Sequence, residues 1–178
     1  LKYALTAALL FELEALKRIA IVDERLILKD KTPTENRFQT KLLEDITDIN
    51  KDRKLNWWLS KLSSLNSEIR DGIFDNLLDS GALHHQTDPS GKIHSRRYRL
   101  WNDSSYRRIK NSLDRLLLEQ RETDMKTRTL AALIWACRAT DAIYPDKKLR
   151  GDIKYRIGVI GEENDYSRHV RKSVNTAR

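Results

Sequence analysis

The sequence has little of what several classes of protein require. Its 178 residues include one cysteine, Cys137, which excludes a disulfide framework and a cysteine-based zinc site and indicates a reducing compartment. Its six glycines are scattered, and they form no glycine-rich phosphate loop or nucleophile elbow. No apolar run approaches the roughly 18 residues that a membrane-spanning helix needs. We therefore expect neither an enzyme, nor a cofactor-binding or metal-binding protein, nor an integral membrane protein.

Positive charge is what the chain has in excess. Lys and Arg number 34 against 26 Asp and Glu, which gives a formal net charge of +8. Such an excess indicates a polyanionic partner, either a nucleic-acid backbone or anionic lipid headgroups. The length suits one domain spanning residues 1–178. Because Leu1 already lies in a helical pattern, we expect that residues upstream of it are missing, and a signal peptide cannot be judged.

Hydrophobic periodicity predicts a mainly α-helical chain. Residues 3–16 are apolar around most of a helix circumference, as in a central helix packed on several sides. Residues 125–144 predict a second apolar helix that ends at Pro145 and packs on the first. Amphipathic patterns predict further helices over 35–50 with Thr34 as its cap, 57–65, 67–80, from Ser104 or Ser105 to Leu117, and 149–160. The segment after residue 160 shows no clear pattern.

Two β-hairpins interrupt the predicted helices. Short β-prone runs at 19–22 and 25–29 flank Asp23-Glu24, and a second pair at 82–86 and 93–101 flanks the turn TDPSG. The fold class we predict is therefore a single-domain helical bundle, with central hydrophobic helices ringed by amphipathic helices and small β-hairpins.

The second hairpin and the segment after it carry the densest positive charge. Seven Lys or Arg stand between Lys92 and Lys110 against one acid, Asp103. The seven are Lys92, Arg96, Arg97, Arg99, Arg107, Arg108 and Lys110. Near an anionic leaflet each could contribute about 1 kcal/mol of salt-sensitive attraction. The alternative is a solvated face whose cations pair with carboxylates of neighbouring helices.

A winged helix that binds nucleic acid would also place a hairpin after a helix. The helix over 67–80 would then lie in the major groove, and the hairpin would contact phosphates. That helix, however, carries four acids and the single basic residue Arg70, so it would present the wrong charge to a duplex. We therefore keep the winged helix only as the alternative.

The aromatic and histidine side chains in this region give weaker signals. Trp101, Trp57 and Trp58 are suited to anchoring at a membrane interface, although such tryptophans more often lie in a core, as we expect for Trp135. His84 and His85 are adjacent in a predicted strand, so they point to opposite faces and cannot chelate one metal ion together.

Four patches taken together resemble the Golgi phosphoprotein 3 family of peripheral membrane proteins. They are ALLFELEALKRI, DKTPTENRFQTKLLEDI, EIRDGIFDNLLDSGAL and KTRTLAALIWACRATDAI, in that order over nearly the whole chain. The resemblance implies a mostly helical domain whose N-terminal part is missing here. It also implies binding of phosphatidylinositol 4-phosphate, an adaptor role for the cytosolic tails of membrane proteins, and self-association into a homo-oligomer. In a eukaryote the protein would lie on the cytosolic face of the Golgi.

The resemblance also implies a headgroup site made of an aromatic residue and three arginines. Arg70 matches one of these arginines, whereas Ser67 and Thr6 stand at the positions of the other two. The aromatic position lies upstream of Leu1. Because only Arg70 is retained, the resemblance supports binding of anionic phospholipid more strongly than recognition of one phosphoinositide. These departures fit a distant member of the family, such as a bacterial one. The predicted phosphate-binding set therefore consists of Arg70, Ser67 and Thr6, together with Arg96, Arg97 and Arg99 of the hairpin.

Overall fold

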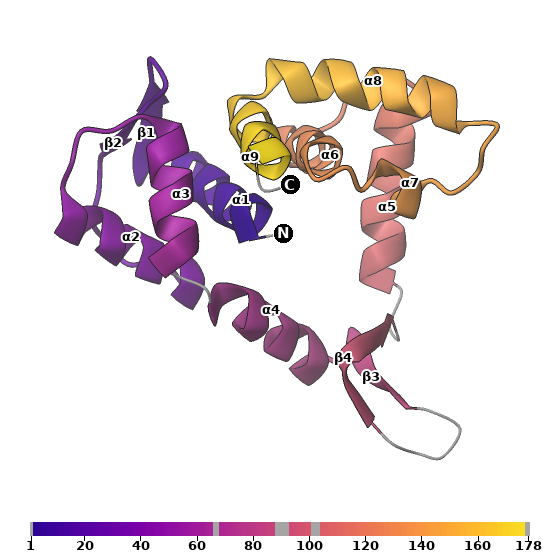
Figure 1. The fold of residues 1–178 in the computed structure, drawn as a ribbon, viewed down its shortest axis with the longest axis horizontal. Helices are drawn as coiled ribbons and strands as arrows, with labels where there is room; N and C mark the ends of the chain where they lie inside the picture. The colour runs from indigo at the N-terminus through magenta and orange to yellow at the C-terminus, as the bar shows by residue number, and fades with distance from the viewer. Residues whose placement is uncertain (1, 66–67, 88–92, 101–103, 177–178) are drawn as a thin grey trace.

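The computed structural model describes residues 2–65, 68–87, 93–100 and 104–176, and these are mainly helical (Figure 1). The helices are α1 (Lys2–Ala15), α2 (Arg37–Ile49), α3 (Leu55–Leu65), α4 (Glu68–Asp79), α5 (Ser104–Leu117), α6 (Met125–Ala136), α7 (Thr140–Ile143), α8 (Arg150–Glu163) and α9 (Asp165–Thr176). Two antiparallel hairpins, β1 (Ile19–Val22) with β2 (Arg25–Leu28) and β3 (Leu83–Thr87) with β4 (Ile93–Leu100), complete the described elements. The predicted fold class is confirmed.

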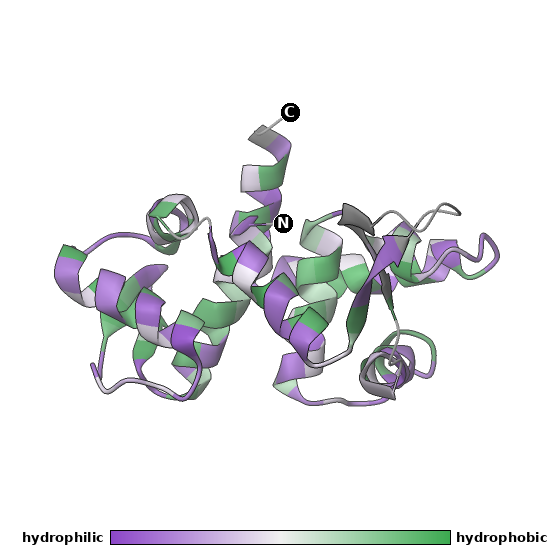
Figure 2. Cartoon of the chain, turned by 90° about the horizontal axis from the view of Figure 1, so that it is seen from below, coloured by the Kyte–Doolittle hydropathy of each residue, from purple (hydrophilic) through white to green (hydrophobic). Residues whose placement is uncertain are grey.

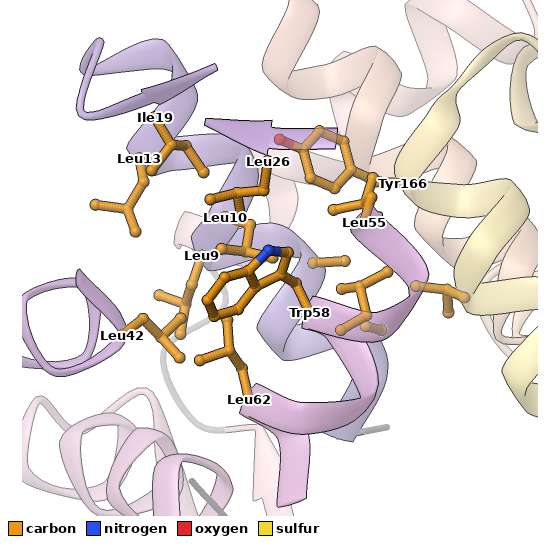
Figure 3. Close-up of a cluster of buried hydrophobic side chains, with 14 of the residues drawn as sticks. Leu9, Leu10, Leu13, Ile19, Leu26, Leu42, Leu55, Trp58, Leu62 and Tyr166 are labelled. Carbon is orange, nitrogen blue, oxygen red and sulfur yellow. The ribbon is translucent and has the colours of Figure 1, made fainter. Parts of the chain in front are cut away.

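The larger hydrophobic core surrounds α1. This helix contacts α2, α3, α6 and α9, which explains why its sequence is apolar on several sides. The indole of Trp58, 1% exposed, lies among Leu9, Leu10 and Leu62 (Figure 3). The prediction that the two apolar helices pack together is confirmed by the contact between α1 and α6.

A second core lies on the other side of α6. It contains Leu113 and Leu117 from α5, Tyr144 from the segment after α7, and Ile153 and Ile157 from α8. Helix α6 contributes Ala131 to this cluster, and Leu133 and Ala136 to the larger one. It therefore joins the two cores. Viewed from below, hydrophilic and hydrophobic residues alternate along the outer helices, as amphipathic helices require (Figure 2).

The predicted helix over 125–144 is wrong as one element, because the chain leaves the α conformation at Arg138. This residue has φ 57°, and the backbone N–H groups of Arg138 and Ala139 donate to the carbonyls of Trp135 and Ile134. That pattern is a Schellman motif, which ends α6 before the short α7 begins. The sequence signal was hidden because arginine takes the place that glycine usually fills.

Two other helix boundaries differ from prediction. Asn36, not Thr34, caps α2, because its side-chain oxygen accepts a hydrogen bond from the N–H of Phe38 at 2.9 Å. Thr34 instead bonds to Thr40 and to the carbonyl of Asn36. The segment after residue 160, which had no predicted structure, continues α8 to Glu163 and then forms α9.

Both predicted hairpins are present. In the first, Ile19 pairs with Leu28 and Val22 with Arg25. Its turn residues Asp23 and Glu24 have φ 49° and 60°, which is the type I′ geometry that matches the twist of the strands. In the second, the register shifts between His85 and Gln86.

Buried His169 on α9 gives a pH-dependent stability prediction. Its side chain is 6% exposed, Nδ1 has no hydrogen-bond partner among the described residues, and burial lowers the pKa of the imidazole. The charged groups around it are Glu24, Asp165, Arg168 and Lys172. Below its ordinary pKa of about 6.5 the unfolded chain binds a proton that the folded chain does not, so stability falls as pH falls.

We therefore expect urea unfolding to show a declining free energy of unfolding between pH 7 and pH 5, and a shallower decline in His169→Gln. His84→Gln is the matched control, because His84 is exposed. Equal slopes in wild type and His169→Gln would contradict the prediction.

Candidate functional site

Helix α5 carries the clearest cationic surface among the described residues. Leu113, Leu116 and Leu117 bury one side of the helix, and the exposed side holds arginines. A surface hollow of about 430 Å³ lies there and is lined by Ser104, Arg107, Arg108, Asn111, Ser112 and Arg115. None of these six lining residues is acidic. We call this set the α5 basic surface.

Lys110, which the charge count also includes, contacts residues at the second core rather than lining the α5 basic surface. Its Nζ lies 2.5 Å from Asp114 and 4.1 Å from the centroid of the Tyr144 ring. The Tyr144 hydroxyl donates to the same Asp114 carboxylate at 2.8 Å. Burial, together with Asp114, raises the pKa of the Tyr144 phenol, so it remains a donor at physiological pH. For Lys110 the structure thus supports the alternative in which basic residues pair with neighbouring carboxylates.

The second hairpin adjoins α4 rather than standing alone. Phe74 of α4 stacks on Tyr98 of β4, with ring centroids 4.8 Å apart and an interplanar angle of 17°. Strand β4 contains the predicted residues Arg96, Arg97 and Arg99, whose side chains lie outside the described part. Of the three, Arg99 pairs with His84 of β3 in the strand register. Lys92 and Trp101 lie outside the described residues as well.

Arg70 lies in the first turn of α4, with its side chain 54% exposed. Its Nε and Nη2 both donate to Asp71, at 2.8 and 2.7 Å. The acids of this helix are all exposed, and they are Glu68, Asp71, Asp75 and Asp79. The outward surface of α4 is therefore acidic.

Of the other two predicted headgroup positions, one is buried in α1 and the other lies outside the described residues. Thr6 is 3% exposed and belongs to the buried side of α1, although α1 and α4 are in contact. Ser67 lies outside the described residues. The members of the predicted phosphate-binding set that the structure describes thus lie on three elements, α1, α4 and β4. The sequence pattern does not indicate the contributions of Ser104 and Asn111 beside the arginines of α5.

The tryptophans in the described part belong mainly to the core. Trp58 is buried, and Trp57 packs against the same cluster with Arg53 over its ring at 5.9 Å. Trp135 is half-buried beneath Arg171, whose guanidinium lies 4.8 Å from the ring centroid. Within the described ranges, no group of three or more His, Cys, Asp or Glu could hold a metal ion.

Comparison with known proteins agrees with the four sequence patches. A sequence model of the Golgi phosphoprotein 3 (GPP34) family matches residues 1–177. No curated protein matches the chain. Among the helices that the structure describes, none is long and apolar enough to cross a membrane. At the level of the family, this match supports a lipid-binding adaptor role. Because the match spans essentially the whole chain, the protein belongs to the Golgi phosphoprotein 3 family.

Proposed function

We propose that the protein docks peripherally on anionic phospholipid, with phosphoinositide-type headgroups as its preferred ligands, and holds the tails of membrane proteins there. The observation that carries the docking is the α5 basic surface, where three exposed arginines and three neutral polar residues line one hollow. In Figure 1, α5 begins beside the β3–β4 hairpin, whose second strand adds three arginines to the chain. The docking surface we propose is therefore the α5 basic surface together with the hairpin beside it.

Arginine is suited to this role because its planar guanidinium donates two parallel hydrogen bonds to one phosphate group. Near an anionic leaflet each cation contributes about 1 kcal/mol, and salt weakens this attraction over a Debye length of about 8 Å at physiological ionic strength. Several arginines acting together thus give weak, reversible docking that depends on salt.

Arg70 is a second candidate for holding phosphate. Both side chains of its ion pair with Asp71 are exposed to solvent, 54% for Arg70 and 65% for Asp71. Exposed pairs contribute only about 0–1 kcal/mol, so a phosphate group can compete for the guanidinium. Thr6 is buried, and we leave it out of the proposed surface.

The adaptor half of the proposal rests on family membership. The exposed acidic residues of α4 would complement the charge of such tails. The cytosolic segments beside membrane-spanning helices are rich in Lys and Arg. A synthetic basic tail peptide should bind the protein, and Asp75→Asn with Asp79→Asn should weaken that binding several-fold. Unchanged binding in this double variant would remove α4 from the proposal.

Docking can be tested by co-sedimentation with vesicles. We expect binding to vesicles that contain phosphatidylserine or phosphatidylinositol 4-phosphate and little binding to phosphatidylcholine alone. Removing two cations with Arg107→Ala and Arg108→Ala should weaken binding about 30-fold at low salt, given about 1 kcal/mol per cation.

Lys51→Ala with Lys61→Ala is the matched control, because it removes equal charge from exposed residues in the α2–α3 region. Equal losses in the two double variants would contradict a localised docking surface. Arg70→Ala tested on both anionic vesicles separates headgroup recognition from general charge. Tight, sequence-selective binding of duplex DNA in a gel shift would instead favour the winged-helix alternative.

A further inference from the structure

An apolar groove lies between α1, α5 and α6, with a volume of about 420 Å³. In Figure 1, α1 and α5 lie on either side of α6. Leu130 and Leu133 of α6 line the groove together with Ala8 and Phe11 of α1 and Ile109 of α5, which is 47% exposed. The remaining lining residues are Glu12, Arg108, Ser112, Asp124, Lys126, Thr127 and Thr129. The groove therefore presents a mainly apolar interior that opens to solvent.

The groove and the α5 basic surface are continuous. Arg108 and Ser112 line both the 420 Å³ groove and the 430 Å³ hollow. A ligand in the groove would thus meet apolar side chains and, where the groove adjoins the hollow, the guanidinium of Arg108. That combination complements an anionic amphiphile, because burial of apolar surface and pairing of charge occur side by side.

Both carboxylates that line the groove, those of Glu12 and Asp124, have hydrogen-bond or ion-pair partners within the protein. Glu12 accepts a hydrogen bond from Gln39 at 2.7 Å and pairs with Lys126 at 3.4 Å. Asp124 caps α6 and accepts from the N–H of Thr127 at 2.7 Å. These carboxylates would repel an anionic head, so we place the head at Arg108, which also lines the α5 basic surface.

We propose that this groove binds a single alkyl chain whose terminal phosphate pairs with Arg108, as in a single-chain lipid phosphate. The volume falls in the range of roughly 300–1,000 Å³ typical of small-molecule sites. The inference rests on the proposed lipid function, and it adds that the protein binds the chain as well as the headgroup.

Titration calorimetry of the full chain with alkyl phosphates below their micelle concentration tests this. Binding should tighten about 250-fold from hexyl to decyl phosphate, since each of the four added methylenes contributes about fourfold when buried. Arg108→Ala should weaken both ligands equally, by about tenfold. Decanol and inorganic phosphate should each bind much more weakly than decyl phosphate. Equal affinity for hexyl and decyl phosphate, or decanol binding as tightly as decyl phosphate, would overturn the proposal.

Ile109→Asn isolates the groove without changing charge. It should weaken hexyl and decyl phosphate several-fold each, because Ile109 follows Arg108 on the same helix and both line the groove, and it should leave co-sedimentation with anionic vesicles unchanged. Val159→Asn on α8 is the matched control, because Val159 is 45% exposed and lies outside the groove. If the wild-type protein bound alkyl phosphates but not anionic vesicles, the docking proposal alone would be overturned. If it bound anionic vesicles but not alkyl phosphates, the groove proposal alone would be overturned.

Discussion

Replacing Glu14 with leucine is expected to lower the free energy of unfolding by about 3 kcal/mol. The Glu14 carboxylate accepts the N–H of Ile21 at 3.0 Å and the hydroxyl of Tyr166 at 2.9 Å, so it joins α1 to β1 and to α9. Hydrogen bonds to a charged group contribute about 1.5–3 kcal/mol, and their loss leaves donors unsatisfied in a partly buried site. Burial and Glu14 raise the pKa of Tyr166, which keeps the donor protonated.

Urea unfolding of a double-mutant cycle would measure this coupling. Glu14→Leu and Tyr166→Phe should together cost less than the sum of the single variants, because both remove the same hydrogen bond. Glu14→Gln should cost less than Glu14→Leu, since its amide oxygen still accepts one bond. Strict additivity in the cycle would show that the two side chains do not interact.

Two glycines of α8 are expected to respond to alanine with opposite signs. A Cβ on Gly161 would lie 2.5 Å from Cδ2 of Trp135, well inside van der Waals contact. Trp135 cannot easily move, because Arg171 covers its ring and donates to its carbonyl at 2.8 Å. We expect Gly161→Ala to destabilise by about 2 kcal/mol through overpacking, even after the gain in helix propensity.

Gly151 lies at the beginning of the same helix, and a Cβ there would meet no atom within 4 Å. Gly151→Ala should therefore stabilise the protein by roughly 0.5–1 kcal/mol, because alanine favours the helix. Thermal unfolding of the two variants beside wild type checks both signs. A stabilising Gly161→Ala would contradict the close packing of α6 on α8.

The elements with strong periodicity were predictable from the sequence, and those determined by tertiary contacts were not. The apolar faces of α2, α3 and α5 follow helical spacing, and the four sequence patches point to the family that the comparison shows. The end of α6 was missed because Arg138 adopts the left-handed conformation without a glycine. The headgroup positions Arg70, Ser67 and Thr6 follow from the family resemblance, and aligned positions cannot show that Thr6 is buried in the core. Charge counting likewise included Lys110, whose partner Asp114 becomes evident only in three dimensions.

The contact between α1 and α9 bears on how the chain matures during synthesis. Tyr166 bonds to Glu14 across 152 residues, and Val170 of α9 completes the core around α1. At 5–20 residues per second, roughly 8–30 seconds separate the synthesis of these two partners. During that interval the apolar circumference of α1 lacks its final cover. We expect the nascent chain to depend on chaperones until α9 leaves the ribosome.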